Sequence, residues 1–88
     1  MVEVGCQPVP GGWRCQVAVE AGGSRTVHSV AVSQADLDRW GGAQPVQDLV
    51  ARSFDFLLER EPPEAILREF DLAVIQRYFP EFDQQFRR

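Results

Sequence analysis

Residues 2–20 read VEVGCQPVPGGWRCQVAVE, and this stretch decides the fold. Apolar residues recur at every second position on both sides of Pro10-Gly11, a pattern typical of two half-buried strands. Proline presets φ and glycine tolerates a positive φ, so Pro10 and Gly11 predict the centre of a tight turn. A shift by one residue would mix apolar and polar positions on each face, so the alternation favours a single register. The apolar pairs of that register are Val2 with Val19, Val4 with Val17, Cys6 with Cys15 and Pro8 with Trp13.

A second turn is predicted at Gly22-Gly23. It places Glu20 opposite Arg25 on the polar face and continues the apolar face into a third strand. The apolar-face pairs are Val17 with His28, Cys15 with Val30 and Trp13 with Val32. We therefore expect a three-stranded antiparallel β-meander over about 2–32, polar on one face and in need of cover on the other.

The rest of the chain predicts helices, which makes the fold class α+β. Ser33 and Asp36 are spaced as a capping box at a helix start. Apolar residues recur at helical spacing through 46–60, although Phe56 lies off this stripe and must meet a second element, a partner or water. Three to four helices are expected, packed on one face of the sheet, over about 34–40, 46–60, 63–69 and 72–79.

The last of these helices has an alternative interpretation. The run Leu72-Ala73-Val74-Ile75 also suits a buried strand, and periodicity cannot decide over so few residues. We favour a helix because Asp71 and Pro80 are typical of helix ends. The tail after Pro80 would add a final turn that holds Phe82 and Phe86.

Composition indicates one small globular domain over residues 1–88, since 44% of the residues are hydrophobic and 25% are charged. The basic residues are all arginine, so lysine chemistry such as Schiff-base formation is excluded. A net charge of −4 opposes binding to nucleic acid or anionic lipid. No apolar run approaches the ~18 residues of a membrane span, and the N-terminus has no secretory signal, so we expect a cytoplasmic protein.

Part of the helical half resembles a known group of sequences. The strings Phe56-Leu57-Leu58-Glu59-Arg60-Glu61-Pro62, Ile66-Leu67-Arg68-Glu69-Phe70 and Arg77-Tyr78-Phe79-Pro80 are similar to the C-terminal helix–Pro–helix block of small uncharacterised bacterial proteins. The resemblance covers roughly the last 45 residues. It implies no known activity, substrate or site.

Cys6 and Cys15 are a candidate thiol pair, because the predicted register places them opposite each other. Side chains approach most closely at a non-hydrogen-bonded pair, so a disulfide is geometrically possible. The favoured interpretation in a cytoplasmic protein is nevertheless two reduced, buried cysteines. Adding His28, expected to be half-buried at the sheet edge, gives only three potential zinc ligands where structural sites use four. No metal site and no cofactor are predicted.

Nothing in the sequence indicates an enzyme. No serine lies in a Gly-x-Ser-x-Gly context, and no glycine pair is followed by the Lys-Ser/Thr of a phosphate-binding loop. The carboxylate pairs Asp36/Asp38 and Glu59/Glu61 fall at predicted exposed helix ends, where solvated charge is usual.

The aromatic content suggests a function. Two Trp, one Tyr and six Phe offer more aromatic area than a three-stranded sheet easily covers. The sequence therefore predicts a non-enzymatic protein-interaction module, a homodimer or a subunit of a larger assembly. The candidate interface residues are Phe56, Tyr78, Phe82 and Phe86. Against this, the rings could simply complete a thin core.

Two alternative functions remain open at the level of sequence. Residues 63–79 have the outline of a helix-turn-helix that could offer Gln76 and Arg77, with the terminal Arg87 and Arg88, to nucleic acid. A thiol redox-responsive protein could instead use Cys6 and Cys15.

Overall fold

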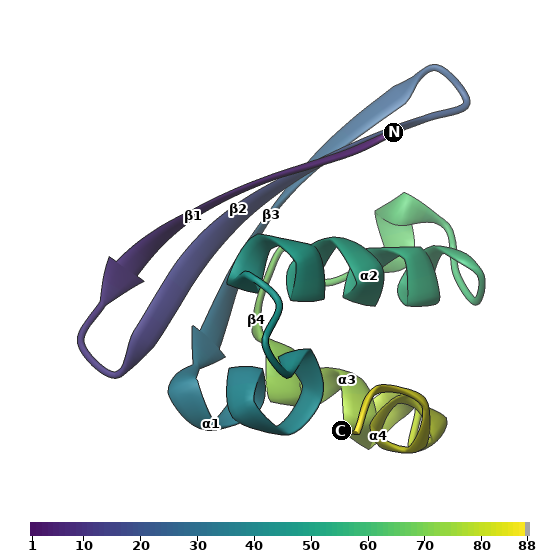
Figure 1. The fold of residues 1–88 in the computed structure, drawn as a ribbon. Coiled ribbons are helices and arrows are strands. Elements are labelled where there is room, and N and C mark those ends of the chain that lie inside the picture. The colour runs from purple at the N-terminus through teal and green to yellow at the C-terminus, as the bar shows by residue number, and fades with distance from the viewer. Residues whose placement is uncertain (88) are drawn as a thin grey trace.

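A computed structural model describes residues 1–87 of the chain (Figure 1). Its sheet has four strands in the order β1-β2-β3-β4. The first three pair antiparallel, and the fourth joins β3 in parallel. The class is therefore α+β as expected, but the sheet is mixed rather than a three-stranded meander alone. The strands are β1 (Val2–Val9), β2 (Gly12–Ala21), β3 (Ser24–Ser33) and β4 (Glu69–Asp71).

The register predicted for both hairpins is confirmed. Cys6 lies opposite Cys15, and Val17 lies between Val4 and His28. The first turn places Gly11 at a φ of 82°, which a residue with a Cβ rarely adopts. The apolar face is buried where β2 and β3 meet, and Val17 at its centre is completely buried.

The helix predicted over 34–40 is present as an α turn followed by a π turn over 34–41, and the helix predicted over 46–60 ends at Leu58. Most of the helical segments are a single turn or two. Only one of them, α2, is long, and it runs over Val46–Leu58. The others are α1 (Gln34–Asp36), a π-helical turn (Leu37–Gly41), 3₁₀ turns (Pro63–Ala65 and Leu72–Val74), α3 (Ile75–Tyr78) and α4 (Glu81–Phe86).

The predicted capping box at the start of α1 is confirmed. The Asp36 backbone N–H donates to the Ser33 hydroxyl at 3.0 Å, and the Ser33 N–H donates to the Asp36 carboxylate at 3.1 Å. The helix continues as a π turn that places Trp40 entirely inside the protein. This fixes the direction in which the chain leaves the sheet.

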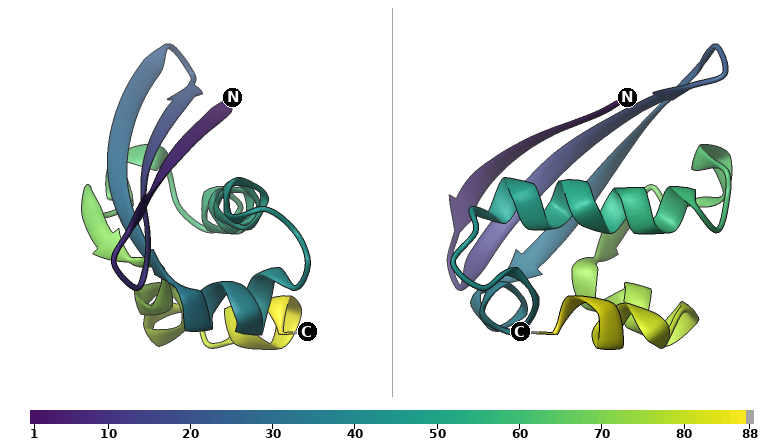
Figure 2. Two further views of the ribbon diagram at one scale, coloured as in Figure 1. Left: turned by 60° about the vertical axis from the view of Figure 1, so that its left-hand side comes forward. Right: turned by 45° about the vertical axis from the view of Figure 1, so that its right-hand side comes forward.

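Helix α2 covers the apolar face of the sheet, which curls around it (Figure 2). Its predicted stripe is buried, with Leu49, Val50 and Phe54 fully enclosed. Phe56, off the stripe, meets a second element rather than solvent. Its ring packs edge-on against Phe82 with ring centroids 5.2 Å apart.

The prediction of a helix over 63–69 is wrong beyond its first turn. After the 3₁₀ turn at Pro63–Ala65 the chain is extended, and Glu69–Asp71 form β4. The free edge of β3 explains the difference: the Ser29 N–H donates to the Arg68 carbonyl at 2.7 Å. An unpaired strand edge gains backbone hydrogen bonds that outweigh the weak propensity of a short helix.

The predicted helix over 72–79 is confirmed as a continuous helical segment over 72–78, and the alternative strand over 72–75 is not formed. It begins as a 3₁₀ turn, and the α-helical portion α3 is four residues long. Asp71 occupies the N-cap position as predicted, with an extended backbone that also belongs to β4, but its side chain makes no capping hydrogen bond. The final turn expected around Phe82 and Phe86 is confirmed as α4.

Trp40 joins the two ends of the helical half. Its indole N–H donates to the Asp83 carboxylate at 2.9 Å, and its ring meets Phe82 edge-on with centroids 5.0 Å apart. Asp83 also accepts from the Arg87 guanidinium at 2.8 Å. This contact holds α4 against the π turn and closes the core below α2.

Gly12→Ala should destabilise the fold, because a Cβ there would collide with the Val32 carbonyl oxygen and lie 2.9 Å from the Ser33 Cα. Both are backbone atoms that cannot rotate away. We expect a loss of about 2 kcal/mol in the free energy of unfolding, measured by urea denaturation. Gly5→Ala is the matched control, since nothing lies within 4 Å of a Cβ at that strand position. Equal effects of the two substitutions would contradict the close approach at Gly12.

The pH dependence of stability should report the Asp83 contact. The Trp40 indole N–H and then the Arg87 guanidinium lower the pKa of Asp83 below its ordinary value. A lowered pKa in the folded state contributes stability that is fully present above the unfolded pKa of about 4 and is lost as the pH falls further. Asp83→Asn should therefore weaken the loss of stability on acidification from about pH 5 to about pH 3. Urea denaturation at several pH values measures this, and an unchanged slope would show that the contact carries no charge-dependent stability.

Candidate interaction surface

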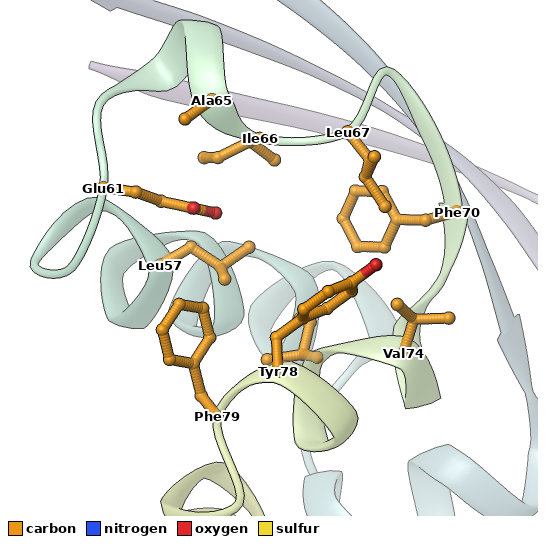
Figure 3. Close-up of a pocket in the computed structure, with 10 residues that line it drawn as sticks. Leu57, Glu61, Ala65, Ile66, Leu67, Phe70, Val74, Tyr78 and Phe79 are labelled. Carbon is orange, nitrogen blue, oxygen red and sulfur yellow. The ribbon is translucent and has the colours of Figure 1, made fainter.

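A pocket of about 200 Å³ opens between the end of α2 and the segment that returns to the sheet. Its walls are almost entirely apolar (Figure 3). Two large residues at its rim are exposed: Leu67 at 48% and Tyr78 at 67%. The lining residues are Leu57, Glu61, Ala65, Ile66, Leu67, Phe70, Val74, Ile75, Tyr78 and Phe79.

The rim of this pocket is held in place by β3. The His28 ring nitrogen Nδ1 lies 2.7 Å from the Leu67 carbonyl oxygen, and the next residue along, Arg68, accepts from the Ser29 N–H. With its backbone fixed, Leu67 directs its side chain outward while Ile66 is buried. The pocket wall is therefore positioned by the sheet and not by a free loop.

His28 is completely buried, not half-buried at an edge as predicted, because β4 adds a strand beyond β3. A carbonyl oxygen only accepts, so Nδ1 carries the proton that it donates to Leu67. The other nitrogen, Nε2, lies 2.9 Å from the Thr26 hydroxyl. Both ring nitrogens are thus used, and the ring packs on Phe54 with centroids 5.3 Å apart. The single histidine serves packing and positioning.

Three of the four predicted interface residues lie in the core, which corrects that prediction. Phe82 is fully buried, and Phe56 and Phe86 are 4% and 6% exposed. Phe82 and Phe86 stack with centroids 4.3 Å apart and fill the space below α2. These rings complete a thin core, the alternative that the sequence had left open. Of these four residues, only Tyr78 is exposed to a partner.

Cys6 and Cys15 are joined by a disulfide across β1 and β2, with their Cα atoms 4.0 Å apart. The favoured expectation of two reduced cysteines is therefore not what the structure contains. Cys15 is buried completely, and Cys6 is half-buried on the edge strand. The bond joins the two strands at one edge of the sheet, whereas β4, beside the pocket, forms the other edge.

The sequence did not predict the position of Glu61. Asp36 and Glu61 were both expected at exposed helix ends, but Asp36 is buried in the capping box and Glu61 lines the pocket. In Figure 3 the Glu61 side chain points toward Ile66 and Leu57. Pro62 and Pro63 end the helix at this point and direct the chain back over it. No sequence signal places this carboxylate in an apolar pocket, because the opposite wall comes from residues after the prolines.

The structure does not contain the predicted helix-turn-helix. Residues 63–79 form a 3₁₀ turn, a strand and a short helix in place of two helices. Arg77 lies near Arg14, Glu69 and Asp71 along a shallow groove of mixed charge beside Tyr78. Arg88 lies outside the described residues. Within residues 1–87 no group of three or more His, Cys, Asp or Glu side chains is arranged to hold a metal ion.

Because comparisons with known proteins find no match to the chain, the site is interpreted from its own geometry. No helix within residues 1–87 is long and apolar enough to cross a membrane. The chain matches no protein-family model, no curated protein and no solved structure. The resemblance of residues 56–80 to small bacterial proteins therefore stays a prediction.

Proposed function

We propose that this chain is a small, non-enzymatic protein-interaction module that binds its partner through the surface around Leu67 and Tyr78. The observation that carries the proposal is the exposure of these two large side chains at the rim of one apolar pocket. The other exposed large apolar residues do not line this pocket: Met1 precedes β1, Val9 ends β1 and Val27 lies on β3. Exposed apolar patches mark sites of protein interaction, and tyrosine is enriched among the residues that dominate binding energy.

The rigidity of the surface supports the same proposal. Leu67 is held through its carbonyl by His28, and Tyr78 ends α3, whose Ile75 is buried in the core. Side chains on fixed backbone lose less conformational entropy on binding than side chains on a mobile loop. The module can act as a homodimer or as a subunit of a larger assembly, and the solution mass distinguishes these forms.

The double substitution Leu67→Ser, Tyr78→Ser should abolish partner binding and leave the fold intact. Because both side chains are largely exposed, we expect the free energy of unfolding to change by no more than about 0.5 kcal/mol each. Light scattering over a concentration series measures self-association. Selection of binders from a random-peptide library measures recognition of another chain.

Val27→Ser is the matched control, since Val27 is similarly exposed, at 46%, but lies on β3 away from the pocket. It should change neither self-association nor peptide binding. A wild-type chain that stays monomeric, together with selected peptides that bind the double variant equally well, would overturn the proposal.

The disulfide favours a second candidate, a thiol redox-responsive protein. An external dithiol would attack the half-buried Cys6 sulfur, form a mixed disulfide with it and release Cys15 as a thiolate. The second thiol of the reagent would then close the reagent's own disulfide and release the Cys6 thiol. Disulfides persist in oxidising compartments and are rare in the cytosol. A cytoplasmic location is therefore compatible with this disulfide only if the bond is one that forms and breaks there.

Reduction of the Cys6–Cys15 bond should lower the free energy of unfolding by about 2–3 kcal/mol, because the bond closes a short loop in the unfolded chain. Urea denaturation with and without a dithiol measures the difference, and a Cys6→Ala, Cys15→Ala chain should not respond to the dithiol. A redox function requires in addition that reduction changes binding at the pocket or the solution mass. Unchanged binding and mass in the reduced chain would leave the bond with a purely structural role.

A further inference from the structure

Glu61 is the one ionisable acid that lines the apolar pocket. It follows the end of α2, where its backbone N–H donates to the Leu57 carbonyl at 2.9 Å. Its carboxylate extends from one side of the pocket, while Leu67, Phe70 and Tyr78 lie on the other (Figure 3). The pocket therefore combines apolar walls with a single negative charge.

This charge has no cationic partner within the described part of the chain. The acids that form ion pairs there are Glu20, Asp36, Glu59, Glu69, Glu81 and Asp83. The neighbouring cation, Arg60, forms its ion pairs with other acids, Glu59 and Glu81. It pairs with Glu81 at 3.1 Å and lies over the Phe56 ring, 3.6 Å from its centroid. A carboxylate beside apolar walls is stabilised when a ligand supplies the missing positive charge.

Resting on the proposed function, we propose that this pocket recognises an arginine side chain of a basic segment in the partner protein. The methylene stem would lie along Leu57 and Ile66, and the guanidinium would pair with Glu61. A planar guanidinium also stacks on aromatic rings, which Tyr78 offers at the rim. A ligand of this kind satisfies both the apolar walls and the charge.

The size and charge of the site select this occupant over others. At about 200 Å³ the pocket is smaller than the ~300–1,000 Å³ of sites for drug-sized ligands and cofactors, so it suits a single side chain. An anionic group would be repelled by Glu61. A second copy of this chain is disfavoured by the net charge of −4 that each copy carries. A basic segment of another protein meets all three conditions.

The test is a nuclear magnetic resonance titration of the full, isotope-labelled chain with butylguanidinium and with butylurea. Butylguanidinium reproduces the arginine side chain, and butylurea has nearly the same shape without the charge. We expect saturable shifts at the amides of Glu61, Ile66, Leu67 and Tyr78. The wild type should bind the cation about three- to tenfold more tightly than the urea.

Glu61→Gln keeps the size of the side chain and removes its charge, so the two probes should bind it equally. Glu64→Gln is the matched control: it removes an exposed carboxylate three residues away that does not line the pocket, and it should keep the preference. Spectra of both variants without probe show whether the fold is intact.

Three results would each overturn the inference. The wild type could bind the two probes equally, Glu61→Gln could keep the preference for butylguanidinium, or no saturable shift could occur at the pocket. The outcomes separate this inference from the proposed function. If selected peptides still depend on Leu67 and Tyr78 while the probes show no charge preference, the interaction module stands and the arginine site falls. Peptides that bind by the same two residues and lose affinity in Glu61→Gln would support both.

Discussion

The rest of the structure depends on covering one face of a strongly curled hairpin sheet. Apolar and polar residues alternate along β1, β2 and β3, so the three strands share one apolar face. Leaving this face exposed to water would forfeit the free energy gained by burying apolar surface. Helix α2 lies in the curve of the sheet (Figure 2). Its apolar stripe belongs to the same buried core as Val17, Cys15 and Val30. Because α2 is the only long helix within residues 1–87, the remaining short turns must be held by specific contacts, such as Trp40 with Asp83.

The same constraint explains the placement of the aromatic rings. A chain this short has little interior, so nearly every large ring is needed to close the space below α2. Phe56, Phe82 and Phe86 pack against one another there, and Phe54 contacts His28 above them. Tyr78 is the exception. Trp13, Phe70 and Phe79 are half-buried, and Tyr78 is the one exposed aromatic ring among the described residues, which makes it the position where a partner is expected.

The two candidate functions use separate parts of the molecule. The disulfide ties the edge strand β1 to β2, whereas the pocket is built by the end of α2, the segment after it and α3. They are connected through the sheet, where His28 on β3 holds the Leu67 carbonyl, and through α2, which contacts β1 and contributes Leu57 to the pocket. A change at the disulfide could reach the pocket by altering how β2 and β3 pack on α2.

By itself, the sequence determined what depends on neighbours along the chain: both hairpin registers, the capping box at Ser33, the apolar stripe of α2 and the α+β class. Period-two alternation and turn glycines act over a few residues and leave few alternatives. Only the tertiary structure decided that residues 69–71 become a strand, that His28 is fully buried and that Glu61 faces an apolar pocket. Each of these depends on a partner far away in the sequence: the free edge of β3 competes with local helix propensity, and the wall opposite Glu61 exists only after the chain has turned back at Pro62-Pro63. Tertiary pairing outweighs propensities of a few tenths of a kcal/mol per residue, and such propensities are all that a short segment reveals.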